Sequence, residues 1–122
     1  MSHNIPSDLN YTSDHEWAKI NGDIAAIGIT DFAQNALGDI VFVELPQVGT
    51  TLDQGATFGV VESIKSVSDL FAPLEGEVVE VNSALESSPE EINQNPYDSW
   101  IIKVKLSDPD QVKSLLTANQ YT

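Results

Sequence analysis

The sequence predicts a mainly β domain, a small sandwich or barrel with short helices and a C-terminal helix. Three observations favour this fold class. Short runs of apolar, β-forming residues recur along the chain, turn signals separate them, and no alternation of strands with long helices suggests a parallel sheet. With 122 residues, we expect one domain over residues 1–122, with a short flexible lead-in over about 1–9.

The N-terminal half begins with a hairpin signal. Asn21-Gly22 lies between strand-like runs at 15–20 and 23–29, and a type I′ turn suits it because both turn positions need positive φ. Thr30 or Asp31 can then cap a short helix with the sequence DFAQNAL. Gly38 is expected to end that helix.

The next strands are expected at 40–45, 57–63 and 77–81, with SDLFA (68–72) leading away from a bend near residue 65. The first of these, IVFVEL, is an almost unbroken apolar run, which predicts a strand covered on both faces.

The C-terminal third is expected to contain a loop, a strand and a helix. Residues 82–98 predict a loop with one helical turn around 83–85. In the strand at 100–106 the buried face is expected to carry Trp100, Ile102, Val104 and Leu106, and the other face Lys103 and Lys105. Asp108 caps the last helix, with Pro109 first, Gln111 completing a capping box, and an inward stripe of Val112, Leu115 and Leu116.

The composition excludes several functions. The net charge is −14, from 19 acidic residues and 5 lysines, so the surface repels nucleic acids and anionic membranes and attracts basic protein surfaces. The chain has no cysteine, which rules out disulfides, thiolate catalysis and cysteine-ligated metals. It also lacks a metal-binding or catalytic motif, a signal peptide and a membrane-spanning run. We therefore expect a non-enzymatic cytoplasmic protein.

Lys65 is the residue most suggestive of function. It stands alone between Lys19 and Lys103, at the bend of a strand–turn–strand segment. Most turn lysines are simply solvated. A lysine at a hairpin tip, however, offers one amine to solvent on a rigid base, which is what a covalent attachment site requires.

The sequence around Lys65, ESIKSVSDLFAPLEGEVVEVN, closely resembles the lipoate-bearing segment of the glycine cleavage system H protein family. The segments YTSDHEW, IGITDFAQNALGDIVFVELPQVG and NPYDSWIIKVK are similar to further segments of that family, in the same order and at the same spacing. The resemblance runs from about Asn10 to the C-terminal helix.

The resemblance implies a carrier protein with the flattened β-barrel of lipoyl and biotinyl domains. It implies a lipoyl group joined by an amide to Lys65 and attached by a lipoate ligase or lipoyltransferase. Three enzymes would use it: glycine decarboxylase (P protein) loads an aminomethyl group, aminomethyltransferase (T protein) passes the carbon to tetrahydrofolate, and dihydrolipoyl dehydrogenase (L protein) reoxidises the dithiol. We expect the carrier to act as a monomer.

The resemblance also implies roles for four acidic residues. Glu62, three residues before Lys65, matches an acid that the modifying ligase reads. Asp14, Glu16 and Asp69 match positions around a cleft that shelters the loaded arm, with Trp17 anchoring the strand of Glu16 in the core. Taken singly, each of these acids is most simply a solvated surface residue.

The chain departs from the family pattern at four positions. Ser66 stands where Ala is usual, Ser99 where Gly is common, Ala36 where some members have His, and Glu91 where an apolar residue is usual. The change at Ser99 suggests a different local turn, and Glu91 makes 86–96 the segment least like the family.

Other readings of the sequence remain open. A biotin carrier usually has Met on both sides of its lysine, where this chain has Ile64 and Ser66. A lipoyl domain of a 2-oxo-acid dehydrogenase usually shows Asp-Lys-Ala and a linker. An unmodified acidic binding module, and a relay that supplies lipoyl groups to other carriers, are the remaining alternatives.

Overall fold

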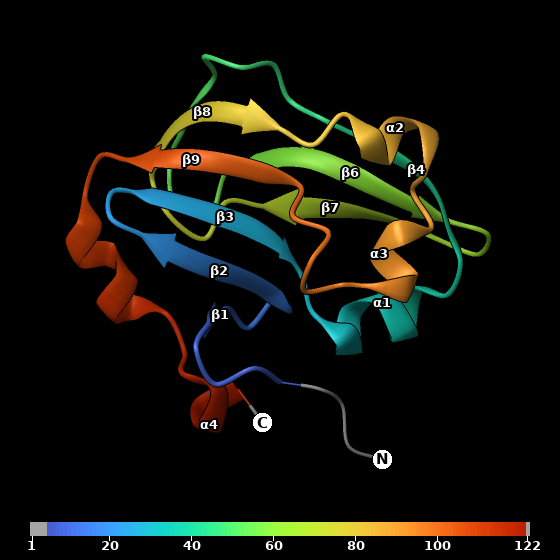
Figure 1. Cartoon of the computed structure of the whole chain (residues 1–122), viewed down its shortest axis with the longest axis horizontal. Helices are drawn as coiled ribbons and strands as arrows, with labels where there is room; N and C mark the ends of the chain where they lie inside the picture. The colour runs from blue at the N-terminus through green and yellow to red at the C-terminus, as the bar shows by residue number, and fades with distance from the viewer. Residues whose placement is uncertain (1–4, 122) are drawn as a thin grey trace.

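The computed structural model describes residues 5–121 and contains two antiparallel β-sheets that enclose a shared apolar core (Figure 1). The larger sheet has six strands, in the order β1 (Asn10–Tyr11), β2 (Glu16–Asn21), β3 (Ile24–Ile29), β9 (Ile102–Leu106), β8 (Gly76–Val81) and β5 (Thr51–Leu52). The smaller sheet has three, in the order β4 (Ile40–Glu44), β6 (Thr57–Ser63) and β7 (Val67–Phe71). The expected mainly β sandwich or barrel is confirmed.

Short helices lie at the ends of the strands (Figure 1). They are α1 (Asp31–Leu37), α2 (Ala84–Ser87), α3 (Glu91–Gln94), a 3₁₀ helix η1 (Pro109–Ser114) and α4 (Ala118–Tyr121). Within residues 5–121, every helix falls short of the length and apolar character that crossing a membrane requires. Leu9, in the expected lead-in, is buried against Tyr11 and Trp17, whereas residues 1–4 lie outside the described part of the chain.

The β2–β3 hairpin and α1 form where the sequence predicts them. The hairpin loop is Gly22-Asp23, one residue later than expected, because Asn21 already pairs with Ile24. Of the two loop residues only Gly22 has a positive φ, which corresponds to a type II′ turn rather than type I′. The Thr30 hydroxyl caps α1 by accepting a hydrogen bond from the Ala33 amide, and Gly38 ends the helix at φ 83°.

The prediction that β4 is covered on both faces was wrong. β4 is an edge strand of the smaller sheet, and its Val41 and Phe42 are 53% and 47% exposed. The register shifts between Ile40 and Phe42, so the strand alternates irregularly and turns two apolar side chains outward. An apolar run alone does not distinguish a central strand from an edge strand that offers an apolar surface.

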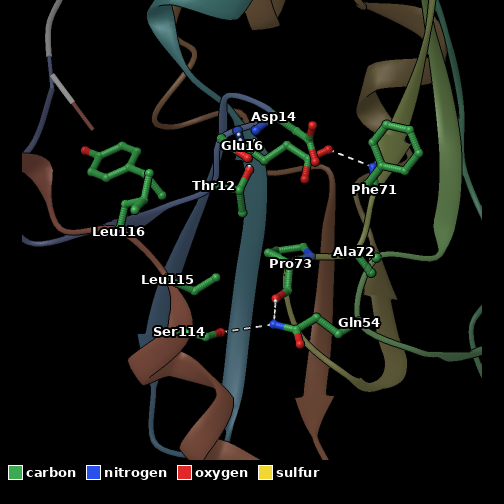
Figure 2. Close-up of a pocket in the computed structure, with 13 residues that line it drawn as sticks. Thr12, Asp14, Glu16, Gln54, Phe71, Ala72, Pro73, Ser114, Leu115 and Leu116 are labelled. Atoms are coloured by element: carbon green, nitrogen blue, oxygen red, sulfur yellow. Dashed lines mark hydrogen bonds between the residues drawn. The ribbon is translucent and has the colours of Figure 1, made fainter. Parts of the chain in front are cut away.

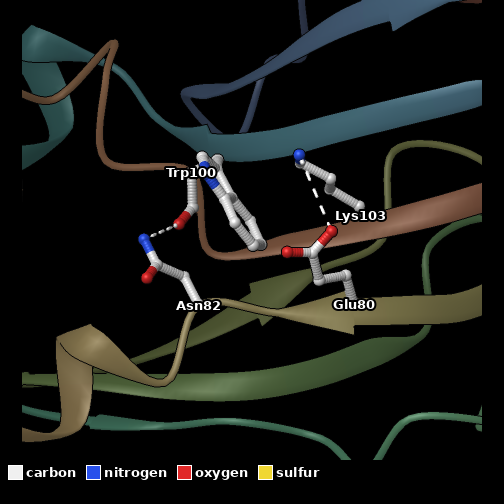
Figure 3. Close-up of polar contacts among 4 residues, drawn as sticks. All are labelled: Glu80, Asn82, Trp100 and Lys103. Carbon is white, nitrogen blue, oxygen red and sulfur yellow. Dashed lines mark hydrogen bonds and ion pairs between the residues drawn. The ribbon is translucent and has the colours of Figure 1, made fainter.

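Trp100 does not share the buried face of β9. Ile101 and Ile102 are both fully buried, and this break in alternation turns Trp100 to the outer side of the sheet. There the ring lies 4.6 Å from the Nζ of Lys103, which also pairs with Glu80 at 3.7 Å (Figure 3). The expected alternation holds from Ile102 to Leu106.

The expected loop at 82–98 contains two helices instead of one helical turn. Leu85 in α2 and Ile92 in α3 are each 1% exposed and belong to the main core, so burial stabilises helices that local propensity alone would not. Ser99 needs no glycine-like conformation, and its hydroxyl donates to the carbonyl of Glu91 at 3.0 Å.

The expected C-terminal helix is split. Asp108 caps it and Pro109 begins it, but the first part is the 3₁₀ helix η1. Gln111 does not complete a capping box, because its side-chain carbonyl accepts a hydrogen bond from the Glu75 amide at 2.8 Å. The expected inward stripe divides between two apolar clusters, with Leu115 in one and Leu116 in the other.

Candidate functional site

Lys65 lies at the tip of the β6–β7 hairpin. Strand β6 ends at Ser63 and β7 begins at Val67, which leaves three residues in the loop, all exposed. Among the described residues Lys65 makes no ion pair; the pairs found there belong to Lys103 and Lys113. The amine is therefore free to reach solvent while the two paired strands fix its backbone.

The Ser63 hydroxyl holds the loop in shape. Its Oγ accepts hydrogen bonds from the amides of Lys65 at 3.3 Å and Ser66 at 3.1 Å. It also lies 3.3 Å from the Ser66 hydroxyl, so Ser66, where the family usually has Ala, joins the same network. Ser63 is 8% exposed, and these contacts satisfy a side chain that would otherwise be buried without partners.

The tip also rests on the turn between α1 and β4. The amide of Ile64 donates to the carbonyl of Asp39 at 3.1 Å. A Cβ added at Gly38 would come within 3.6 Å of the Cε of Lys65, so the lysine stem passes over this glycine. The positive φ of Gly38 ends α1 at this point, which leaves an uncrowded surface beneath the tether.

A cleft of about 170 Å³ opens between α1 and the β6–β7 hairpin. Asp14, Glu16 and Asp69 all line it, so the structure brings together the three acids that the sequence pointed to. Leu37, next to Gly38, lines it as well, which places the cleft beside the stem of Lys65. Ala36 forms part of the wall, in the place where some family members have His.

Glu16 differs from the other two acids because it is buried. It is 2% exposed, whereas Asp14 and Asp69 are exposed. One carboxylate oxygen, Oε2, accepts a hydrogen bond from the Phe71 amide at 2.7 Å, and the other, Oε1, has no partner among the described residues (Figure 2). Burial raises the pKa of Glu16 to about 8, against the lowering effect of the Phe71 amide and with a smaller raising effect from the Asp14 charge.

A second cavity, of about 250 Å³, is also lined by Glu16 (Figure 2). Its walls come from the β1–β2 loop, the segments around Gln54 and Pro73, and the end of η1, and they share Asp14 and Glu16 with the cleft. Next along β2, Trp17 is 2% exposed in a separate apolar cluster, as expected. Glu16 thus borders two hollows.

The contacts that hold the cleft wall were not predicted from the sequence. His15 has a φ of 66°, a conformation that few residues other than glycine adopt. Its Nδ1 lies 2.7 Å from the Tyr121 hydroxyl, which is also 2.7 Å from the hydroxyl of Thr30, and its ring packs on Phe32 of α1. A histidine next to Glu16 was a visible signal, but the pairing of residues 15 and 121 has no signature in the sequence.

Glu62 lies on the outer face of the smaller sheet rather than in the cleft. It pairs across the strands with Phe42 on one side and Val67 on the other. It is half-buried, with open access beside the lysine tip. Among the described residues no group of three His, Asp or Glu side chains could hold a metal ion.

Comparisons with known proteins match this chain to one family. The family model described as glycine cleavage H-protein matches residues 9–122. Two curated relatives named glycine cleavage system H protein, from two strains of Staphylococcus epidermidis, are 53% and 52% identical over 119 residues, covering 97% of this chain and 94% of each relative. A crystal structure of a glycine cleavage system H protein from Mycobacterium marinum has a TM-score of 0.88 and 47% identity, covering 96% of this chain and 95% of the other.

These matches span nearly the whole chain, and the solved structure shares its fold. The chain therefore belongs to the glycine cleavage H-protein family, whose members are non-catalytic lipoyl carriers of the glycine cleavage system.

Proposed function

We propose that Lys65 is the residue that carries the lipoyl group, through an amide at its Nζ. The single observation that carries the proposal is the position of this lysine: exposed, without an ion pair among the described residues, and at the tip of a hairpin fixed by Ser63 and Asp39. Such an amine can enter the active site of a lipoate ligase or lipoyltransferase without unfolding its surroundings. Glu62, on the open face beside the tip, serves as the acid that this enzyme recognises.

The residues present also fit the cargo that the arm would carry. When attached, the lipoyl group supplies the pair of redox-active sulfurs that this cysteine-free chain lacks. The unpartnered Oε1 of Glu16 is a buried hydrogen-bond acceptor on a residue that lines the cleft. A protonated amine of an aminomethyl cargo would satisfy that oxygen, and the exposed carboxylates of Asp14 and Asp69 would stand at the entrance.

Binding of that amine would also change the protonation state of the Glu16 carboxyl. The carboxyl is largely protonated at neutral pH because burial raises its pKa to about 8. A cation against Oε1 favours the ionised form, so the carboxyl would release its proton as the amine enters. The cleft can therefore remain stable when empty and become complementary to a cation when filled.

The partners that follow from this role are glycine decarboxylase, aminomethyltransferase and dihydrolipoyl dehydrogenase, which the carrier would visit in turn. A net charge of −14 favours weak, salt-sensitive docking to basic surfaces on each of them. A single tether on a rigid base raises the effective concentration of the cargo at each active site. We further propose that the carrier works as a monomer in the cytoplasm.

The proposal is tested with Lys65→Arg, because a guanidinium keeps the charge but cannot form the amide. Lys19→Arg is the matched control, since Lys19 is an exposed lysine on β2 far along the chain from the tip. In a reconstituted glycine cleavage assay we expect Lys65→Arg to lose all carrier activity with unchanged folding, and Lys19→Arg to keep it. Full activity of Lys65→Arg would refute the proposal.

A further inference from the structure

An exposed apolar surface surrounds the tip of the β6–β7 hairpin. Among the described residues, seven large hydrophobic side chains are strongly exposed, and four of them lie on β4 or at this hairpin: Val41 (53%), Phe42 (47%), Ile64 (72%) and Val67 (65%). Apolar side chains gathered in this way on one face are typical of a site of interaction.

The strand register places these side chains in an ordered pattern. Phe42, Glu62 and Val67 are direct cross-strand partners, so they form one row across β4, β6 and β7 on the outer face. Two residues further from the tip, Glu44, Val60 and Asp69 form the next row, and Asp69, on the edge strand β7, also borders the cleft. The first row is apolar–acid–apolar and the second is acid–apolar–acid. We call these six residues, together with Ile64 at the tip, the tip patch.

The tip patch carries negative charge around its apolar side chains. Glu44, Glu62 and Asp69 are its acids, it contains no basic residue, and Lys65 stands next to it at the hairpin tip. A complementary partner would bring apolar side chains to Phe42 and Val67, and Lys or Arg side chains to the acids. Within residues 5–121 no element covers the apolar side chains of this face, since Phe42 and Val67 are 47% and 65% exposed.

We propose that the tip patch is the docking surface for the enzyme that acylates Lys65, which rests on the proposed function of that lysine. Two classes of enzyme could dock here: the one that acylates Lys65, and those that act on the far end of the finished lipoyl arm. The distance of the reacting atom from the hairpin distinguishes them. Acylation brings the Nζ itself into an active site, so the enzyme covers the residues at the base of the tip. The enzymes that act on the far end of the finished arm reach it across the lysine stem and the whole acyl chain, and they do not require contact with Phe42 or Val67.

Two kinds of variant test this surface in the unmodified protein. Val67→Ser and Phe42→Ser each remove an apolar contact, and Val67→Thr is a second variant at that position that keeps the β-branched shape suited to a strand. Val48→Ser is the matched control, because Val48 is 60% exposed in a loop outside the tip patch. Thermal unfolding of each variant establishes that the fold is retained.

The measurement is kcat/KM for acylation by a purified lipoate ligase with ATP and lipoate, followed by intact mass. Val67→Ser and Phe42→Ser are expected to lower kcat/KM by about tenfold, as for central side chains of an interface. Val48→Ser is expected to stay within about twofold of the parent, as for a residue outside the interface. Glu44→Gln is expected to weaken the dependence of the rate on salt.

Equal acylation rates for the parent, Val67→Ser, Val67→Thr and Phe42→Ser would overturn the docking surface while leaving the role of Lys65 intact. Failure of the parent itself to be acylated at Lys65 would instead overturn the proposed function. Fully lipoylated Val67→Ser is also assayed as a substrate of dihydrolipoyl dehydrogenase, where we expect the parent rate. A loss there as large as in acylation would overturn the assignment of the patch to the acylating enzyme.

Discussion

The hydroxyl of Tyr121 lies 2.7 Å from the Nδ1 of His15. It also reaches the hydroxyl of Thr30, the N-cap of α1, so the end of the chain ties the loop before β2 to the start of a helix. Both tied segments contribute to the cleft beside Lys65, through His15 and through Phe32. The C-terminal residues therefore help to hold the cleft wall although they lie far from the lysine in sequence.

Tyr121→Phe should lower the stability of the fold by about 1–2 kcal/mol, because it removes two hydrogen bonds while keeping the ring that stacks on Tyr11. The strained backbone of His15, at φ 66°, would lose one of its supports. Urea unfolding measures the change. Lys113→Ala, an exposed substitution in η1, is the control, and equal stability of Tyr121→Phe and the parent would contradict the role of this contact.

Glu16 should make the stability of the unmodified protein depend on pH. Burial raises its pKa from the ordinary 4.5 to about 8 in the folded protein. Between these two values the folded state holds a proton that the unfolded state does not, so the free energy of unfolding should decrease as pH rises from about 4.5 to about 8. Below that interval both states are protonated at this residue and its contribution is fully present.

Glu16→Gln should remove this decrease, because the amide has no charge to bury. At pH above 8 the variant should be more stable than the parent by up to roughly 5 kcal/mol, since the pKa rises from 4.5 to about 8 and each pKa unit corresponds to about 1.4 kcal/mol. Urea unfolding of both proteins across this pH range measures the difference. Parallel pH profiles for the two proteins would show that Glu16 is not the group responsible.

Although Glu16→Gln should stabilise the unmodified protein at high pH, it should destabilise the aminomethyl-loaded form. Glu16→Gln should leave acylation of Lys65 intact but shorten the lifetime of the aminomethyl-loaded carrier by about tenfold, because a charge-assisted hydrogen bond is lost. Release of formaldehyde or of ammonia from the purified loaded protein measures that lifetime. Glu44→Gln, outside the cleft, is the control, and release no faster than from the parent would remove Glu16 from the site.

Ser63→Ala should loosen the tip that presents Lys65. The substitution leaves the amides of Lys65 and Ser66 without their acceptor, which should cost about 1 kcal/mol of stability. Acylation should slow about threefold, while Ser63→Thr, which keeps the hydroxyl, should restore most of the rate. The rate is followed by intact mass, and an unchanged rate for Ser63→Ala would show that the hydroxyl does not order the tip.

Much of the fold could be predicted from local signals in the sequence. Asn21-Gly22 predicted the first hairpin, and Thr30 with Gly38 predicted both ends of α1, because turn and cap chemistry act within a few residues. The outward turn of Phe42 and of Trp100 could not be predicted in this way. The orientation of Phe42 depends on the irregular register between β4 and β6, and that of Trp100 on the burial of both residues that follow it, Ile101 and Ile102.

Only part of the candidate site could be predicted from the sequence. Lys65 at a hairpin tip follows from the strands on either side of it, and the three acids came from resemblance. The burial of Glu16 and the pairing of His15 with Tyr121 arise only when β2 packs between the cleft and the C-terminal segment. Of the 19 acidic residues, Glu16 is a buried hydrogen-bond acceptor because of tertiary packing and not because of its residue type.

The most direct test is the mass of the protein isolated from its native host, followed by peptide mapping around residues 60–71. We expect one lipoyl adduct, on Lys65, and none on Lys19, Lys103, Lys105 or Lys113. A biotin adduct, a lipoyl adduct on another lysine, or no adduct under conditions that induce glycine breakdown would contradict it.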